Sequence, residues 1–308
     1  MSKKILVIGG TYFCGRVFAI LAARAGYELT FINRGRYSMK SLGEGVKEYR
    51  ADRRDADSLR SCGLSDDFDA VVDFCAYEPN DILNIFEALS CSTKKYIYMS
   101  SADVYRRAPG VKTEDSPLVE EMPSDEVGLY AYKKRLLEDE LKKAAAGFGF
   151  AYTIIRPAFV YGPYNYAPRE PVYIQSLIQN KPIYQPVDAE GKFQMVYVKN
   201  IAEAIIAAIE KEEADNKAFN LSAPEVLDYT AFLDLMKEVS GINDPQVIEV
   251  TVSQVDEQRL PLPFPLTEYE NELFDGSRAA AELGIEYTDI KEGMKKTFDS
   301  FRPVFDRK

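Results

Sequence analysis

The sequence predicts a doubly wound α/β fold, in which helices cover both faces of a parallel sheet. Three observations predict it. Over the first 160 residues, short strand patterns alternate with helical patterns, as in βαβ units. The strand patterns are largely apolar, which is typical of strands buried on both faces. A glycine-rich turn at residues 9–15 joins the first strand to the first helix.

The elements of this first part follow one another regularly. Strand patterns occur at residues 5–8, 28–33, 46–51, 70–74, 96–100 and 152–156. Helical patterns occur between them, at residues 16–25, 55–61, 79–89 and 129–146. The acidic run at residues 138–140 lies in the last of these helices and is expected to be a solvated face.

Beyond Gly162 the pattern changes, because prolines and tyrosines become frequent and the strands are short and scattered. Helices are predicted at residues 173–179, 201–211, 230–239, 277–283 and 291–298. The prolines at 261, 263 and 265 predict an extended loop over residues 260–267. We therefore expect a first domain at residues 1–160 and a smaller, loop-rich lobe at residues 161–308. Some segments of this lobe are expected to return to the first domain.

The composition disfavours several classes of function. A net charge of −11 argues against binding along a nucleic-acid backbone, which needs a basic face. No apolar run approaches the ~20 residues of a membrane span, and the N-terminal apolar run is too short for a signal peptide. The four cysteines show no metal-binding spacing and fit a reducing compartment. We expect a cytoplasmic protein without a metal site and without nucleic-acid or membrane partners.

The glycine-rich turn has the position of a dinucleotide-binding loop. Unpaired N–H groups at the start of a helix meet a pyrophosphate there, which would make residues 1–160 a Rossmann domain. Gly9 would permit the tight turn and Gly15 the close packing of helix on sheet, whereas Tyr12 stands where a middle glycine is usual. A tight turn without a ligand is the alternative. The candidate cofactor-binding residues of the turn are Gly9, Gly10, Thr11, Tyr12, Phe13 and Gly15.

The end of the second strand pattern bears on the choice between NAD and NADP. A carboxylate there would hold the ribose 2′-hydroxyl, but this chain has Asn33 and Arg34, followed by Arg36. Guanidinium groups suit a 2′-phosphate, so we favour NADP over NAD as the cofactor. A solvated basic turn is the alternative. Asp52, at the end of the third strand pattern, could reach the adenine or could be solvated.

Ser101, Tyr130 and Lys134 form the candidate catalytic group. The chain contains no histidine, so histidine cannot serve as base, nucleophile activator or metal ligand. Tyr130 and Lys134 lie one helical turn apart, so the lysine ammonium is expected to lower the phenol pKa from its usual ~10. Ser101, at a strand end, would hold the substrate oxygen. Tyr and Lys are common on helix surfaces, but the glycine turn and the Ser100–Ser101 pair upstream give the spacing weight.

Several segments together resemble the extended short-chain dehydrogenase/reductase superfamily, in particular its NAD-dependent epimerase/dehydratase members. The segments are residues 9–15, 98–105, 155–163, 196–202 and 218–221, with Tyr130 and Lys134. Within the superfamily the chain is similar to a divergent branch that includes chloroplast stem-loop RNA-binding proteins and bacterial reductase-like proteins. The resemblance implies bound NAD(P), Tyr130 as acid/base, Lys134 on the nicotinamide ribose, and Ser101 orienting a small-molecule substrate. It also allows a homodimer.

The resemblance supports the family's reaction centre in this chain more strongly than it supports the family's substrate. Members commonly act on nucleotide-diphosphate sugars, but this chain has Phe159 for an asparagine and Phe193–Gln194 for an arginine. We expect an epimerase, dehydratase or reductase acting on a nucleotide-sugar or carbohydrate-like carbonyl or alcohol. A non-catalytic dinucleotide-sensing or RNA-binding protein is the alternative. Tyr164 and Arg169 follow the last strand and are candidate substrate residues; both could equally be surface residues.

Overall fold

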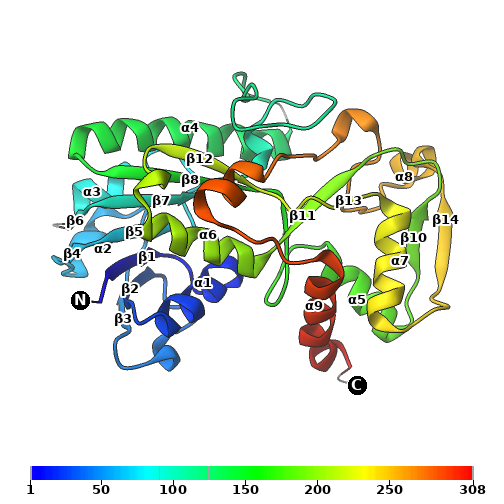
Figure 1. The fold of residues 1–308 in the computed structure, drawn as a ribbon, viewed down its shortest axis with the longest axis horizontal. Helices are drawn as coiled ribbons and strands as arrows, with labels where there is room; N and C mark the ends of the chain where they lie inside the picture. Colours follow the sequence, from blue (N-terminus) through cyan, green and yellow to red (C-terminus); the bar gives the residue numbers. More distant parts are fainter. Residues whose placement is uncertain (1, 90, 124, 307–308) are drawn as a thin grey trace.

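The fold centres on a seven-stranded parallel sheet, shown in Figure 1. The structure is a computed structural model and describes residues 2–89, 91–123 and 125–306. The strand order is β12-β8-β7-β5-β1-β2-β3. The strands are β1 (Lys4–Ile8), β2 (Glu28–Asn33), β3 (Lys47–Arg50), β5 (Ala70–Asp73), β7 (Lys95–Met99), β8 (Ala151–Pro157) and β12 (Lys217–Leu221). The predicted doubly wound α/β fold is confirmed.

Helices cover both faces of this sheet, as the alternation of side chains along β1 illustrates. Ile5 and Val7 pack into one core with α1 (Phe13–Arg24) and α6 (Val198–Glu210). Leu6 and Ile8 pack into a second core on the opposite face. The helices of that face are α2 (Ala56–Ser61), α3 (Leu83–Ala88) and α4 (Glu126–Phe148). The chain leaves β1 toward β2 on one side and reaches β5 on the other, so the sheet's topological switch point lies between β1 and β5.

Among the residues that the structure describes, the second lobe is built from short strands and four helices, at the right of Figure 1. Its strands are β9 (Phe159–Tyr161), β10 (Ile183–Pro186), β11 (Phe193–Tyr197), β13 (Val226–Leu227) and β14 (Val247–Val250). Its helices are α5 (Glu170–Gln179), α7 (Tyr229–Ser240), α8 (Val252–Gln258) and α9 (Ile290–Phe305). Because β12 and α6 lie in the layers of the first part, the chain returns there after residue 161. No helix among the described residues is long and apolar enough to cross a membrane.

Short elements complete the fold. They are β4 (Asp67–Phe68), β6 (Ser92–Thr93), the turns of 3-10 helix η1 (Lys40–Leu42), η2 (Ala102–Val104), η3 (Glu212–Ala214) and η4 (Glu268–Glu270), and the π-helical turn η5 (Ala279–Leu283). The helix expected at 79–89 is shorter than predicted, because Asn80 has a positive φ of 70° and the Asp81 carboxylate accepts from the N–H groups of Tyr77 and Glu78. Helix α8 was not expected; Thr251 caps it with a capping box. The loop at 260–267 forms neither helix nor strand, as predicted.

Candidate active site

Two adjoining cavities lie beside the glycine turn and the ends of the sheet strands. One, of about 560 Å³, is the nucleotide cavity: it is lined by residues that follow β1, β2, β3 and β5. The other, of about 420 Å³, is the reaction cavity: it contains Ser101, Tyr130 and Lys134. Tyr12, Tyr77 and Tyr166 line both cavities. Apart from Gly10, which lines neither cavity, the candidate cofactor and catalytic residues therefore border one continuous region.

The glycine turn is shaped as a cradle. Gly9 and Gly10 have φ of +76° and +66°, a region that favours glycine. A Cβ on Gly10 would lie 2.4 Å from Val7 Cγ1, and a Cβ on Gly15 would lie 2.2 Å from Gly10 Cα. Tyr12, the N-cap of helix α1, makes no side-chain cap, and the first turn of α1 contains no acidic residue, so side chains leave its first N–H groups uncapped. The backbone N–H groups at the start of α1 and the space beside the glycines fit the diphosphate of a dinucleotide.

The nucleotide cavity is rich in guanidinium groups. Asn33 Oδ1 accepts a hydrogen bond from Gly35 N at 2.7 Å, so this side chain shapes the turn after β2. Asp52 Oδ1 accepts from Arg54 N at 3.1 Å in the same way after β3. Both predicted residues line the cavity, as do the guanidinium-bearing residues Arg34, Arg36, Arg53 and Arg54.

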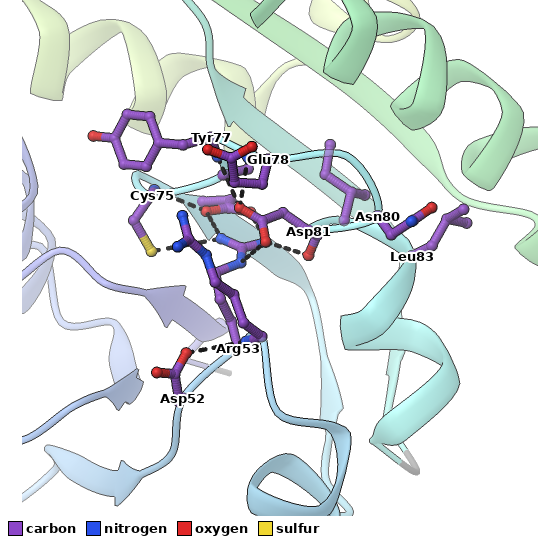
Figure 2. A network of polar contacts seen from close by, with 12 residues as sticks. Asp52, Arg53, Cys75, Tyr77, Glu78, Asn80, Asp81 and Leu83 are labelled. Atoms are coloured by element: carbon purple, nitrogen blue, oxygen red, sulfur yellow. Dashed lines mark hydrogen bonds and ion pairs between the residues drawn. The ribbon is translucent and has the colours of Figure 1, made fainter. Parts of the chain in front are cut away.

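Arg53, which the sequence reasoning did not single out, is the centre of the network in Figure 2. Its Nη1 and Nη2 donate to the two carboxylate oxygens of Asp73 at 2.7 and 2.8 Å. Nη2 also donates to the Asp81 carbonyl, and Nη1 contacts Cys75 Sγ at 3.5 Å. Burial alone would raise the pKa of Asp73, but the Arg53 guanidinium holds this pKa below its usual value. A buried ion pair therefore fixes the chain between β5 and α3 beside the nucleotide cavity.

The catalytic candidates come from the end of β7 and from α4. Lys134 Nζ donates to the carbonyl oxygens of Ala76 and Met99 at 3.0 and 2.9 Å, and the side chain is 2% exposed. Nζ lies 5.9 Å from the centre of the Tyr130 ring. Burial lowers the pKa of Lys134 to about 8. Lys134 is therefore a buried ammonium at neutral pH, held by one carbonyl at the end of β7 and one in the loop after β5.

We expected the pKa of Tyr130 to lie below its usual value, but in the structure this pKa is raised. Burial and the negative charge of Asp103 raise this pKa well above its usual value. The neighbouring Ser101 hydroxyl and the charge of Arg169 oppose the rise. Tyr130 is therefore a neutral phenol here, because desolvation and the Asp103 carboxylate outweigh the opposing effects of Ser101 and Arg169.

Glu138 corrects a second expectation, since it belongs to the acidic run predicted to be a solvated face. Its carboxylate is fully buried and accepts from Ser100 Oγ at 2.7 Å. Arg156 Nε and Nη2 donate to it at 2.9 and 2.6 Å. Glu138 lies one turn after Lys134 on the same face of α4. Its contacts with Ser100, after β7, and with Arg156, in β8, hold this face of α4 against the sheet. The spacing of four residues between Tyr130, Lys134 and Glu138 could have indicated that Glu138 lies on the buried face of this helix.

Of the two predicted substrate residues Tyr164 and Arg169, only one lines the reaction cavity. Arg169 lines the reaction cavity, but Tyr164 lines neither cavity, because its ring lies against the Arg16 guanidinium at 5.1 Å. Tyr166 takes the place expected for Tyr164. Asp103 and Glu272 also line the reaction cavity and were missed. Asp103 stands within the strand-end motif, whereas nothing in the local sequence marks Glu272.

A sheet with this order and a glycine cradle at its switch point defines a Rossmann-type α/β protein built like the extended short-chain dehydrogenases/reductases. A model of the NAD dependent epimerase/dehydratase family matches residues 5–222. The chain belongs to this family.

The chain is similar to a chloroplast stem-loop binding protein and to several sugar-nucleotide epimerases. The chloroplast stem-loop binding protein of 41 kDa b of Arabidopsis thaliana is 29% identical over 83% of this chain and 68% of that protein. The UDP-glucose 4-epimerase of Thermotoga maritima, solved with UDP-glucose, has a TM-score of 0.77 at 20% identity, covering 98% of this chain and 99% of that one. The UDP-glucose 4-epimerase of Thermus thermophilus, solved with NAD, has a TM-score of 0.75 at 19% identity, covering 97% and 99%. These structures share the fold.

Proposed function

We propose that the protein is an NAD(P)-dependent epimerase, dehydratase or reductase acting on a carbohydrate-like carbonyl or alcohol. Ser101, Tyr130 and Lys134 gather in one cavity that adjoins the nucleotide cavity, and this observation carries the proposal. When bound, NAD(P) supplies or accepts a hydride. Four unpaired cysteines are in keeping with a cytoplasmic enzyme.

Tyr130 is assigned the proton transfer. In the reduction direction, the carbonyl carbon gains the hydride while Tyr130 Oη gives its proton to the carbonyl oxygen, which leaves an alcohol and a phenolate. Solvent then returns a proton to Tyr130. Lys134, whose Nζ is 5.9 Å from the Tyr130 ring centre, stabilises this phenolate by its charge. Ser101 orients the substrate oxygen, and oxidation follows the same path in reverse.

The guanidinium groups of the nucleotide cavity support NADP as the cofactor. Arg34, Arg36 and Arg54 line it beside Asn33, and none of them forms a hydrogen bond from its guanidinium to a described residue. A 2′-phosphate would pair with such free groups. We expect Arg34→Gln to weaken NADP binding at least tenfold and to leave NAD binding unchanged, as measured by calorimetry. Equal loss for both nucleotides would contradict this choice.

The proposal is tested first by mass spectrometry of the natively purified protein. Tightly retained NAD would favour an epimerase or dehydratase, in which the cofactor is regenerated within each turnover. Exchangeable NADP would favour a reductase. Absence of any affinity for NAD and NADP would contradict the proposed function.

The second test is the pair Tyr130→Phe and Tyr132→Phe. Both residues lie on α4, but only Tyr130 lines the reaction cavity. We expect Tyr130→Phe to lower kcat by about 10²–10⁴-fold, the usual contribution of a positioned acid or base. Nucleotide affinity should change little, and Tyr132→Phe should keep full activity. Full turnover by Tyr130→Phe would refute the assignment of Tyr130.

A second candidate is a non-catalytic dinucleotide-sensing or RNA-binding protein. The 29% identity with the Arabidopsis chloroplast stem-loop binding protein favours it. The net charge of −11 disfavours an RNA-binding surface. A gel-shift assay with stem-loop RNA over a range of salt concentrations separates the two, because phosphate-backbone binding is strongest at low salt.

A further inference from the structure

Three tyrosine rings that contact one another in succession border the nucleotide cavity; we call Tyr37, Tyr12 and Tyr166 the tyrosine row. The rings of Tyr37 and Tyr12 stack, with centres 5.4 Å apart and planes 17° apart. The ring of Tyr166 lies against Tyr12, with centres 5.4 Å apart and planes 38° apart. The three residues come from the turn after β2, the glycine turn and the loop before α5. The row therefore joins three segments that are distant in the sequence.

Arg36 lies at one end of this row. Its guanidinium carbon is 5.4 Å from the centre of the Tyr37 ring. The guanidinium forms no hydrogen bond or ion pair with any residue that the structure describes. Arg34 and Arg54 line the same cavity, but neither of them lies over an aromatic ring of a described residue. Arg36 is therefore the one of these three that a ring holds while its N–H donors stay available.

The other end of the row is anchored in the second lobe. The side chain of Asn165, beside Tyr166, is 4% exposed. Its Nδ2 donates to Glu170 Oε1 at 2.7 Å, and its Oδ1 accepts from Ala167 N at 2.9 Å. These bonds fix the loop that carries Tyr166, and Tyr166 in turn contacts Tyr12.

Tyr12 fits its place in the row without strain. Its φ of −139° and ψ of 158° are extended values that any residue adopts. The backbone therefore does not require the glycine that is usual at this position. The tyrosine ring instead supplies Tyr37 with a stacking partner.

The row bears on how well Arg36 can bind an anion. An exposed arginine side chain loses conformational entropy when a ligand fixes it. Cation–π attraction to a ring restricts the guanidinium beforehand, so less of this entropy is lost on binding. Tyr37 is itself exposed and can restrict Arg36 only if its own ring is held, which the stack on Tyr12 provides.

We propose that Tyr37 and Tyr12 position Arg36 for the 2′-phosphate of NADP and thereby set a preference for NADP over NAD. The inference rests on the proposed function, because it concerns the nucleotide of the same cavity. A guanidinium pairs with a phosphate through two parallel N–H···O bonds, so its orientation matters as well as its charge. Tyr37 and Tyr12 act through Arg36 and are positioning residues.

The test measures NADP⁺ and NAD⁺ binding by calorimetry. The two nucleotides differ only in the 2′-phosphate, so the ratio of their Kd values isolates the contribution of that group. We expect the wild type to bind NADP⁺ about tenfold more tightly, or better. Tyr37→Ala and Tyr12→Ala should each lower this ratio about threefold or more by weakening NADP⁺ binding alone. Tyr37→Phe and Tyr12→Phe keep the rings and should keep the ratio.

A double-variant cycle assigns the effect to Arg36. Arg36→Gln should lower the ratio, and adding Tyr37→Ala to it should lower the ratio no further, because the residue that Tyr37 positions is gone. Tyr184→Ala is the matched control: Tyr184 is 37% exposed, against 41% for Tyr37, and lines neither cavity. Thermal unfolding checks that each variant folds.

Three results with the variants would overturn the inference: an unchanged ratio in Tyr37→Ala, an equal loss for both nucleotides, or the same effect of Tyr37→Ala with and without Arg36. A wild type that binds NAD⁺ as tightly as NADP⁺ would overturn it while leaving the proposed function standing. Failure to bind either nucleotide would instead contradict the proposed function itself, and the inference with it.

Discussion

Replacing Arg53 by methionine tests whether the buried ion pair beside the nucleotide cavity stabilises the fold. Arg53 is 8% exposed and Asp73 is fully buried, and two hydrogen bonds of 2.7 and 2.8 Å join them. Methionine keeps the apolar length of the side chain but leaves the carboxylate without its cation. Removing one partner of a buried pair costs about 3–5 kcal/mol, so Arg53→Met should lower the free energy of unfolding by that amount.

The cost should depend on pH. In the wild type the pKa of Asp73 is lowered, so its contribution to stability is present above the unfolded value of about 3.9 and is lost as the pH falls through the folded value. In Arg53→Met, burial without the guanidinium raises this pKa above the unfolded value. The variant then loses stability as the pH rises above about 4. The difference between the two proteins should therefore grow from pH 4 to pH 7.

Urea unfolding at both pH values, followed by circular dichroism, measures this difference. Arg60→Met is the matched control, because the Arg60–Asp57 pair is solvent-exposed and should contribute little. Adding Asp73→Asn to Arg53→Met removes the orphaned charge and should recover about 1–3 kcal/mol. A cost no greater than that of Arg60→Met, or an equal cost at pH 4 and pH 7, would refute the reasoning.

Three further predictions concern the reaction cavity and the glycine turn. Asp103→Asn removes a charge that raises the pKa of Tyr130, so the pH at half-maximal alcohol oxidation should shift downward; an unchanged pH–rate profile would contradict this. Gly10→Ala should weaken nucleotide binding at least tenfold in calorimetry, because its Cβ would lie 2.4 Å from Val7 Cγ1 at a φ of +66°. Gly26→Ala is the control: its Cβ would meet no atom within 4 Å, and nucleotide binding should stay unchanged. Lys134→Met should lower kcat at least tenfold, with Lys133→Met as the control.

The sequence could predict those parts of the site that depend on local pattern and strand order. Consecutive strands of a parallel sheet end at the same edge, so the glycine turn, Asn33, Asp52 and Ser101 were expected together. Helical spacing brought Tyr130 and Lys134 to one face. The structure places these residues around the two adjoining cavities.

The rest depends on contacts between segments that no local pattern connects. Glu272 reaches the reaction cavity only because the chain before η5 pairs with β11 in the second lobe. Arg53 and Asp73 each follow an ordinary pattern at a strand end. Only the approach of the chain after β3 to the end of β5 makes them a buried pair. Charge patterning predicted a solvated Glu138, since a helix surface and a buried ion pair use the same residue type.

The chain between β5 and α3 links the two cavities structurally. Arg53 holds it from the nucleotide side through the Asp81 carbonyl, and Lys134 holds it from the reaction side through the Ala76 carbonyl at 3.0 Å. Tyr77, between these two anchors, lines both cavities. Loss of Arg53 should therefore displace one of the two acceptors of the Lys134 ammonium. For that reason Arg53→Met, where it remains folded, is expected to lower kcat as well as nucleotide affinity, whereas a residue serving the nucleotide cavity alone would alter affinity only.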